Sequence, residues 1–230
     1  MIVANRKPIQ ELRAMVEPYE RVLIVGCGTC VTVCLAGGER EAAIIGSALR
    51  MALRLAGNAT TQVDECTVER QCDQAFFDPL SETASRYDAI LSLGCGVGVQ
   101  ELAVRFPQMP ILPGLNTLFM GTLEEQGTWG ERCAGCGHCR LAEFGAICPI
   151  TRCAKRLFNG PCGGSRQGRC EVNREIPCAW QLIYERMKAL GQLDRLKSIA
   201  PMTDWSHSLD GGPRRVVRED QKITQPAVGG

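Results

Sequence analysis

The sequence predicts an α/β protein: a small parallel-sheet, Rossmann-like domain followed by an irregular cysteine-rich metal-binding segment and a C-terminal helix. Two observations predict the first part. Short apolar runs alternate with stretches of helical apolar spacing, and glycines stand where those stretches end. The cysteines predict the second part, since eight of the 14 lie between Cys133 and Cys178. We expect the domain at 1–124, the cysteine-rich region with its helix at 125–200, and an extended tail at 201–230.

The alternation in the first half defines individual elements. RVLIV at 21–25 has an unbroken apolar run after Arg21, which is typical of a strand buried on both faces. From Gly38 a helical pattern runs to a glycine that can end a helix. No GxGxxG motif follows the first strand, so a dinucleotide site of the usual kind has no support. We expect strands at 21–25, 60–65, 88–94 and 109–114, and helices at 38–57 and 98–106.

Composition excludes several classes of function. The chain has 26 basic and 25 acidic side chains, a formal net charge of +1, so we expect no electrostatic binding to nucleic acid. Aromatic residues make up only 5% of the chain, which argues against a stacking platform for bases. No stretch has the roughly 18 apolar residues of a membrane span, and none predicts a signal peptide. We therefore expect a cytoplasmic protein.

In the cytoplasm thiols stay reduced, so clustered cysteines favour metal over disulfides. Cys27 and Cys30 follow the first strand with CxxC spacing, Cys95 follows the third strand, and Cys72 lies beyond the second. Ligands of open α/β sheets bind at the carboxyl ends of the strands, which places these thiols at one rim. The flanking glycines allow backbone N–H groups to approach sulfur. We expect a metal site with Cys27, Cys30, Cys72 and Cys95 at its centre.

For two further cysteines of the first half we expect roles other than that of a central ligand. Cys34 could already belong to the start of the following helix, and it is the substitute ligand for the rim site. Cys66 lies in the hydrophilic stretch VDECTVE, which we place in the loop after the second strand. We expect Cys66 to bind no metal.

The second half opens with RCAGCGHCR, whose C-x2-C-x2-C spacing begins a ferredoxin-like binding run. The run then departs from that pattern, because Cys148 comes nine residues later and is followed by proline. Zinc is the competing metal, but three cysteines at two-residue intervals suit a cluster better than one ion. We expect His138 to form hydrogen bonds or face solvent, and the sequence around His207 indicates no function. The predicted ligands here are Cys133, Cys136, Cys139, Cys148, Cys153, Cys162, Cys170 and Cys178.

Several long motifs resemble one family. ERCAGCGHC, GAICPITRCAK, NGPCGGSRQGRCEV and IPCAWQLIYERMK resemble the MetV-type iron–sulfur subunit of methylenetetrahydrofolate reductase, also known as the C-terminal domain family of that reductase. VGCGTCVTVCLAGGERE, RQCD, LSLGCGVGVQ and LPGLNTLFMG resemble its N-terminal region. The resemblance covers roughly residues 20 to 190. Cys66 falls outside these motifs.

The resemblance implies an electron-transferring subunit of an oxidoreductase of one-carbon metabolism. Its partner would be a flavin-bearing (βα) barrel subunit that reduces methylenetetrahydrofolate to methyltetrahydrofolate, with further electron-donor subunits in some complexes. This chain would carry two or three 4Fe–4S clusters, with zinc as the alternative at one site. We expect no catalytic residue and no cofactor-binding residue besides the metal ligands. The alternative function is a structural zinc or mixed-metal scaffold that passes no electrons.

The end of the chain has an apolar pattern and then a polar tail. Ile183, Met187, Leu190, Leu193 and Leu196 lie near helical spacing within 179–199, so we expect a helix that packs on its own domain or, alternatively, on a partner. From Trp205 the chain is polar, which is typical of a solvated tail or of an arm that orders on a partner.

Overall fold

The computed structural model describes residues 1–206, 212–218 and 220. The chain divides into two compact units, Met1–Arg132 and Cys133–Gly230. The sequence placed this boundary between residues 124 and 125. Among the described residues, no helix combines the length and the apolar character needed to cross a membrane.

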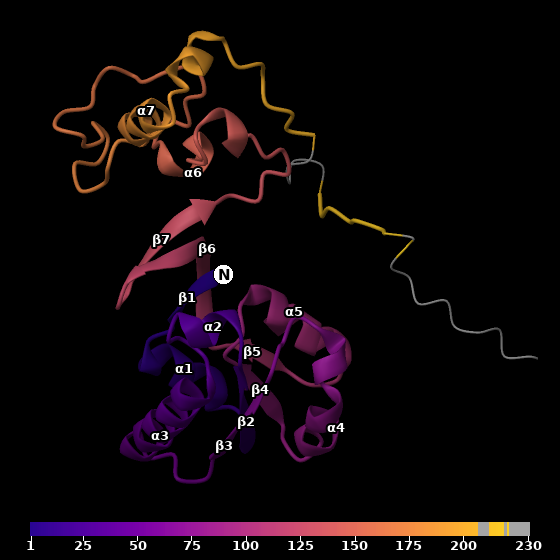
Figure 1. Cartoon of the computed structure of the whole chain (residues 1–230). Coiled ribbons are helices and arrows are strands. Elements are labelled where there is room, and N and C mark those ends of the chain that lie inside the picture. Colours follow the sequence, from indigo (N-terminus) through magenta and orange to yellow (C-terminus); the bar gives the residue numbers. More distant parts are fainter. Residues whose placement is uncertain (207–211, 219, 221–230) are drawn as a thin grey trace, which may run out of the picture. The chain divides into compact units, whose positions relative to one another are not determined.

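The first unit is built on a parallel sheet with the strand order β3-β2-β4-β5 (Figure 1). This confirms the predicted α/β, Rossmann-like class. Each strand overlaps a predicted one: β2 is Arg21–Cys27, β3 is Gln62–Val68, β4 is Ala89–Ser92 and β5 is Ile111–Pro113. The order reverses between β2 and β4, and a crevice for ligands opens at such a point in open α/β sheets.

Helices cover both faces of this sheet, as Figure 1 shows. Val22 and Ile24 of β2 pack on one core, together with α1 (Ile9–Val16) and α3 (Glu39–Leu55). The alternate residues of β2 pack on the other core, with α4 (Asp78–Ala84) and α5 (Gly96–Arg105). Because successive side chains of a strand point to opposite faces, an unbroken apolar run is needed to fill both cores.

A second sheet in the first unit was not predicted. It has the order β1-β6-β7, formed by Ile2–Arg6, Leu115–Glu125 and Thr128–Cys133. The expectation of an irregular chain from residue 125 is therefore wrong for β7. Gly127 supplies the turn with a φ of 88°. A Cβ on Gly121 would lie 2.2 Å from the Gly130 carbonyl oxygen, so the close approach of β6 and β7 requires glycine there.

Regular structure is sparse in the cysteine-rich unit. It has helices α6 (Pro149–Arg152) and α7 (Ala179–Ala189) and the 3-10 turns Leu141–Glu143 and Leu193–Lys197. The predicted helix at 179–199 is confirmed only over its first half. Gly191 has a φ of 66°, which breaks the α-helical path, and the chain continues as a 3-10 turn.

This unit nevertheless has a small apolar core. Ile183 and Met187 of α7 are fully buried there, and Leu193 and Leu196 pack against it. The Phe144 ring meets the Trp180 ring edge-on, with ring centres 5.9 Å apart. The prediction that the helix packs on its own domain is thus confirmed.

Candidate metal centres

The carboxyl ends of three neighbouring strands carry cysteines in the first unit. Cys27 ends β2, Cys95 is the N-cap of α5 just after β4, and Cys72 follows β3 after a short loop. Since β2 lies between β3 and β4, these three positions are adjacent along one edge of the sheet.

The three sulfurs are close enough to influence one another. Partial desolvation raises the pKa of the Cys72 thiol, and the neighbouring Cys95 and Cys27 raise it further because like charges repel. The Cys27 Sγ also lies 3.4 Å from the Thr29 hydroxyl oxygen. A cationic metal centre would reverse this effect, because it stabilises thiolates.

Cys30 and Cys34 of the first half lie on or next to a short helix. Cys30 is the first residue of the short helix α2 (Cys30–Val33), and it helps to raise the pKa of the Cys34 thiol, which burial raises most. The Cys34 thiol lies in the apolar core, with its sulfur 3.8 Å from the Ala4 carbonyl oxygen of β1. The rim site therefore gathers Cys27, Cys72 and Cys95, while Cys34 and Cys27 are both buried in the core that Cys95 packs against.

Cys66 lies inside β3, opposite Val25, and not in the loop predicted from the sequence. The strand runs three residues beyond the predicted end because CTV continues the alternation of the pleat. The thiol packs against the core on the α4 and α5 face, and burial raises its pKa to about 11. Cys66 therefore remains a neutral thiol at physiological pH.

Gln71 organises the rim and was missed by sequence reasoning. Its side-chain amide donates to the Val25 oxygen at 2.7 Å and to the Gly26 oxygen at 3.0 Å, and its own oxygen accepts from the Ser92 hydroxyl at 2.6 Å. The residue is only 1% exposed. It thereby joins the ends of β2 and β4 to the loop that carries Cys72. The signal in the sequence was its place directly before Cys72 in RQCD.

In the second unit, four cysteines line a single small cavity of about 20 Å³. Cys178 reaches it as the N-cap of α7, and the buried Trp180 covers one wall. The Trp180 indole donates to the Leu157 oxygen at 3.0 Å, which fixes the ring. The four cysteines are Cys153, Cys162, Cys170 and Cys178.

An ion pair also lines this cavity. The Lys155 ammonium contacts the Glu171 carboxylate. Lys155 lowers the pKa of Glu171, and the Cys162 thiol lowers it further by donating a hydrogen bond. The pKa of Lys155 is raised mainly by Glu171 and also by the nearby sulfurs of Cys162 and Cys170. A cationic group thus lies beside two of the four sulfurs.

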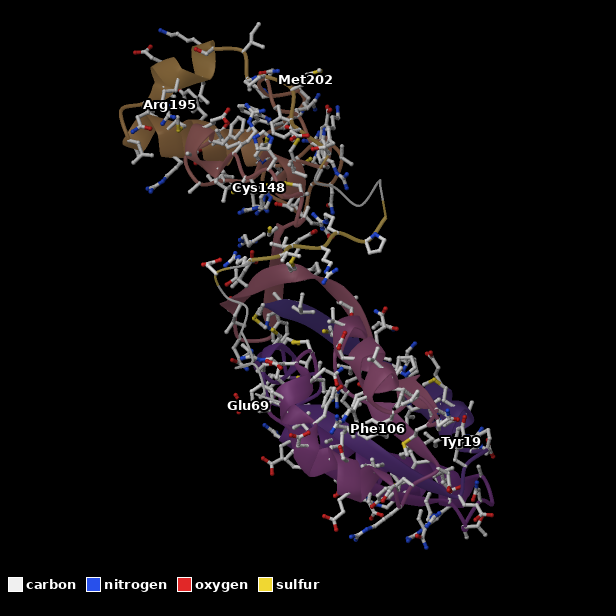
Figure 2. The ribbon with its side chains drawn as sticks, turned by 90° about the vertical axis from the view of Figure 1, so that its right-hand side faces the viewer. Tyr19, Glu69, Phe106, Cys148, Arg195 and Met202 are labelled. Carbon is white, nitrogen blue, oxygen red and sulfur yellow. The ribbon has the colours of Figure 1, made fainter. Side chains whose placement is uncertain are left out.

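The other four cysteines of the second unit come earlier in the sequence than those that line the cavity. They are Cys133, Cys136, Cys139 and Cys148. Cys148 is the N-cap of α6 (Figure 2). The loop bends at Gly135 and Gly137, whose φ values are 61° and 86°. These glycines allow the tight C-x2-C-x2-C spacing, since L side chains rarely adopt such backbone angles.

Backbone amides point at sulfur in both groups. The Gly135 N–H donates to the Cys133 Sγ at 3.4 Å, and the Gly164 N–H donates to the Cys162 Sγ at 3.5 Å. Hydrogen bonds of this kind stabilise thiolates and tune the reduction potential of a cluster that the thiolates bind. The sequence indicated these contacts, because Gly135 stands two residues after Cys133 and Gly164 two residues after Cys162.

His138 has the hydrogen-bonding role expected from the sequence. Its Nδ1 accepts from the Asp204 backbone N–H at 3.1 Å, so the neutral ring carries its proton on Nε2. Asn159 fastens the same downstream stretch, accepting from the Ala200 N–H at 2.7 Å. Residues 200–204 are therefore attached to the cysteine-rich unit. His207 lies outside the described residues, as does much of the predicted tail.

Arg140 clamps this arrangement directly after Cys139. Its side chain is only 5% exposed and forms hydrogen bonds with the Glu143 carboxylate and, at 2.5 Å, with the Pro201 oxygen. Its guanidinium lies 5.3 Å from the Phe158 ring centre. One side chain thus joins the cysteine loop, the aromatic core and the downstream stretch.

Among the residues that the structure describes, no three Cys, His, Asp or Glu side chains are gathered so as to hold a single metal ion. In a four-iron cluster each thiolate binds a different iron, so its four sulfurs stand apart around a cube. Four cysteines around one cavity are a donor set of that kind. By the number and the chemistry of their donors, the residues present fit an iron–sulfur cluster.

Fold and site together define an α/β protein with a cysteine-rich second unit. Residues 112–206 match the family model described as methylene-tetrahydrofolate reductase C terminal. The match covers β6, β7 and the cysteine-rich unit as far as Ser206, which is less than half of the chain. No curated protein and no solved structure matches the chain. The match relates this region to a reductase of folate chemistry.

Proposed function

We propose that this chain is an iron–sulfur, electron-transferring partner subunit of a flavin-dependent methylenetetrahydrofolate reductase. The cavity lined by four cysteines carries the proposal, because four thiolates are the donor set of one 4Fe–4S cluster. The family match of residues 112–206 supplies the link to the reductase. The flavin and the folate would belong to the (βα) barrel partner.

Three groups of cysteines would hold the clusters. Cys153, Cys162, Cys170 and Cys178 form the first group by lining the cavity. The remaining four of the second unit, Cys133, Cys136, Cys139 and Cys148, form the second group. Cys27, Cys72 and Cys95 meet at the rim, and Cys30, in the same CxxC motif as Cys27, is their proposed fourth ligand. When bound, such clusters supply one-electron carriers.

The surrounding residues would tune and protect these carriers. The Gly135 and Gly164 amides donate to sulfur and so favour the more negative, reduced state. The Lys155 ammonium acts in the same direction, since a positive charge stabilises added negative charge. Trp180 limits the access of water to the cavity.

Metal analysis of the purified full-length chain tests this function. We expect about four irons and four acid-labile sulfides for each filled site, hence about 8 to 12 irons per chain. Electron paramagnetic resonance of the dithionite-reduced protein should show the signals of reduced clusters. Zinc alone, without sulfide, would reject electron transfer and support the scaffold alternative.

A further inference from the structure

A tight turn in the cysteine-rich unit places two arginines opposite each other. The Arg166 N–H donates to the Arg169 oxygen at 3.2 Å, and the Arg169 N–H donates to the Arg166 oxygen at 2.9 Å. Gln167 and Gly168 between them have φ values of 52° and 74°, as in a two-residue hairpin turn. The two arginine side chains therefore emerge on the same face, where like charges repel and destabilise the pair.

A third arginine adds to this charge. The Arg174 guanidinium lies 3.5 Å from the backbone oxygens of Gly164 and Arg169. One guanidinium nitrogen of Arg169 donates to the Glu175 backbone oxygen at 2.9 Å. These oxygens are neutral, and the Glu171 carboxylate, which Arg174 also influences, is already paired with Lys155. We call Arg166, Arg169 and Arg174 the basic lobe.

Carboxylates are scarce around the basic lobe. Residues 152–175 contain six basic side chains and two acidic side chains, Glu171 and Glu175, although the whole chain has a net charge of only +1. Glu171 is paired with Lys155. In the part of the chain that the structure describes, no carboxylate forms an ion pair with an arginine of the lobe, and all three arginines are exposed.

The lobe is tied to the cysteines that line the cavity. Its hairpin lies between Cys162 and Cys170 in the sequence. The Cys178 N–H donates to the Gly168 oxygen at 2.7 Å, and the Cys170 N–H donates to the Ile176 oxygen at 3.1 Å. The repelling charges are thus held by the backbone next to the proposed cluster ligands.

We propose that the basic lobe is the docking surface of an acidic electron-carrier protein, an inference that rests on the proposed electron-transfer function. Carboxylates of the carrier would compensate the facing charges of Arg166 and Arg169. A positive surface beside the site also steers an acidic carrier toward it and raises the association rate. A cluster held by the cysteines that line the cavity would accept one electron from the reduced carrier, which is thereby oxidised by one electron, and no atoms would change place.

Binding of two purified acidic carriers, a flavodoxin and a ferredoxin, to the full-length chain tests this inference. Calorimetry at ionic strengths of about 0.01 M and 0.15 M compares unscreened with screened charges, because the Debye length falls from about 30 to 8 Å. The test variant is Arg166→Glu. The matched control is Arg40→Glu on α3, which makes the same charge change at an exposed arginine of the first unit.

We expect at least one carrier to bind at low salt and to bind more weakly at high salt. Arg166→Glu should weaken binding about tenfold, since it replaces an attraction with a repulsion, and Arg40→Glu should leave the affinity unchanged. The melting temperature of Arg166→Glu should not fall, because a Glu–Arg pair replaces a repelling pair. If this variant fails to fold, Arg174→Gln takes its place, with a weakening of about threefold.

Three results would overturn the inference: no binding of either carrier, equal losses in the test and control variants, or tighter binding of a duplex oligonucleotide than of the carriers. Iron content separates the two proposals. If the chain shows iron–sulfur signals but binds neither carrier, the docking surface is refuted and the proposed function is not. A chain without iron refutes the proposed function, whatever it binds.

Discussion

Replacing Gln71 with leucine should destabilise the first unit and loosen its rim. Leucine has a similar volume but can neither donate to the Val25 and Gly26 oxygens nor accept from the Ser92 hydroxyl. The Val25 oxygen keeps a partner, because the Leu93 N–H also donates to it at 2.8 Å. Ser92, which is fully buried, loses the acceptor for its hydroxyl hydrogen.

The magnitude follows from the group left without a partner. The Gly26 oxygen stays within the β2–β3 ladder, so the Ser92 hydroxyl is the group that loses its hydrogen bond. A buried polar group without its hydrogen bond costs about 1–3 kcal/mol, so we expect Gln71→Leu to lower the free energy of unfolding by about 2 kcal/mol. For a unit of this size, that loss corresponds to a fall in melting temperature of about 7 °C.

Hydrogen exchange in a urea series, read from peptides of β2 and β4, measures this loss within the first unit. Gln74→Leu is the matched control, because Gln74 donates only to Glu101, on the half-exposed surface of α5, where water can take its place. We expect the control to cost less than about 1 kcal/mol. Iron at the rim site should fall in Gln71→Leu and stay normal in the control.

A loss below about 0.5 kcal/mol in Gln71→Leu would refute the reasoning, since it would mean that none of the three hydrogen bonds is costly to lose. Equal losses in the two variants would refute it as well, because the effect would then belong to the loop and not to the strand ends.

The remaining predictions concern the clamp, the rim and the buried thiol. Arg140→Met should lower the unfolding free energy of the cysteine-rich unit by about 2–3 kcal/mol, mostly through the lost bond to the Pro201 oxygen, and urea unfolding followed by near-ultraviolet circular dichroism measures it. Glu143→Gln should make this unit less sensitive to acid: Arg140 lowers the pKa of the Glu143 carboxyl, so the pair stabilises above the ordinary carboxyl pKa and is lost as pH falls through the lowered value. Cys95→Ser should remove about four irons per chain while Cys66→Ser removes none, and the reverse result would contradict the rim assignment. Burial raises the pKa of the Cys66 thiol to about 11, so the unfolded chain ionises at a lower pH than the folded one. The free energy of unfolding should therefore fall as the pH rises from the ordinary thiol pKa towards 11. Urea titrations at alkaline pH should show this fall in the unchanged protein and not in Cys66→Ala.

The parallel sheet and the cysteines at the ends of its strands were predictable from sequence patterns. Residues 22–25 of RVLIV are all apolar, which predicted a strand buried on both faces, and Gly57 marks the end of α3. The carboxyl-end position of Cys27 and Cys95 followed from the order of strands and helices, since parallel strands end at the same edge. The ends of β3 and α7 were less determined, because the patterns of CTV and of residues 190–199 fit more than one structure.

Which side chains meet could not be predicted from such patterns, because it depends on the folded arrangement. The sheet β1-β6-β7 joins residues more than a hundred positions apart, as in the pairing of Ile2 with Met120, and no local pattern encodes such a partner. The same holds for Gln71, whose partners lie on two strands, and for Arg140, which reaches Pro201. Cys34 and Cys72 were both candidate ligands from the sequence, yet Cys34 is buried and Cys72 is exposed at the rim. Local propensity sets the elements, but long-range packing and hydrogen bonding set their contacts, and the chain must be folded before those exist.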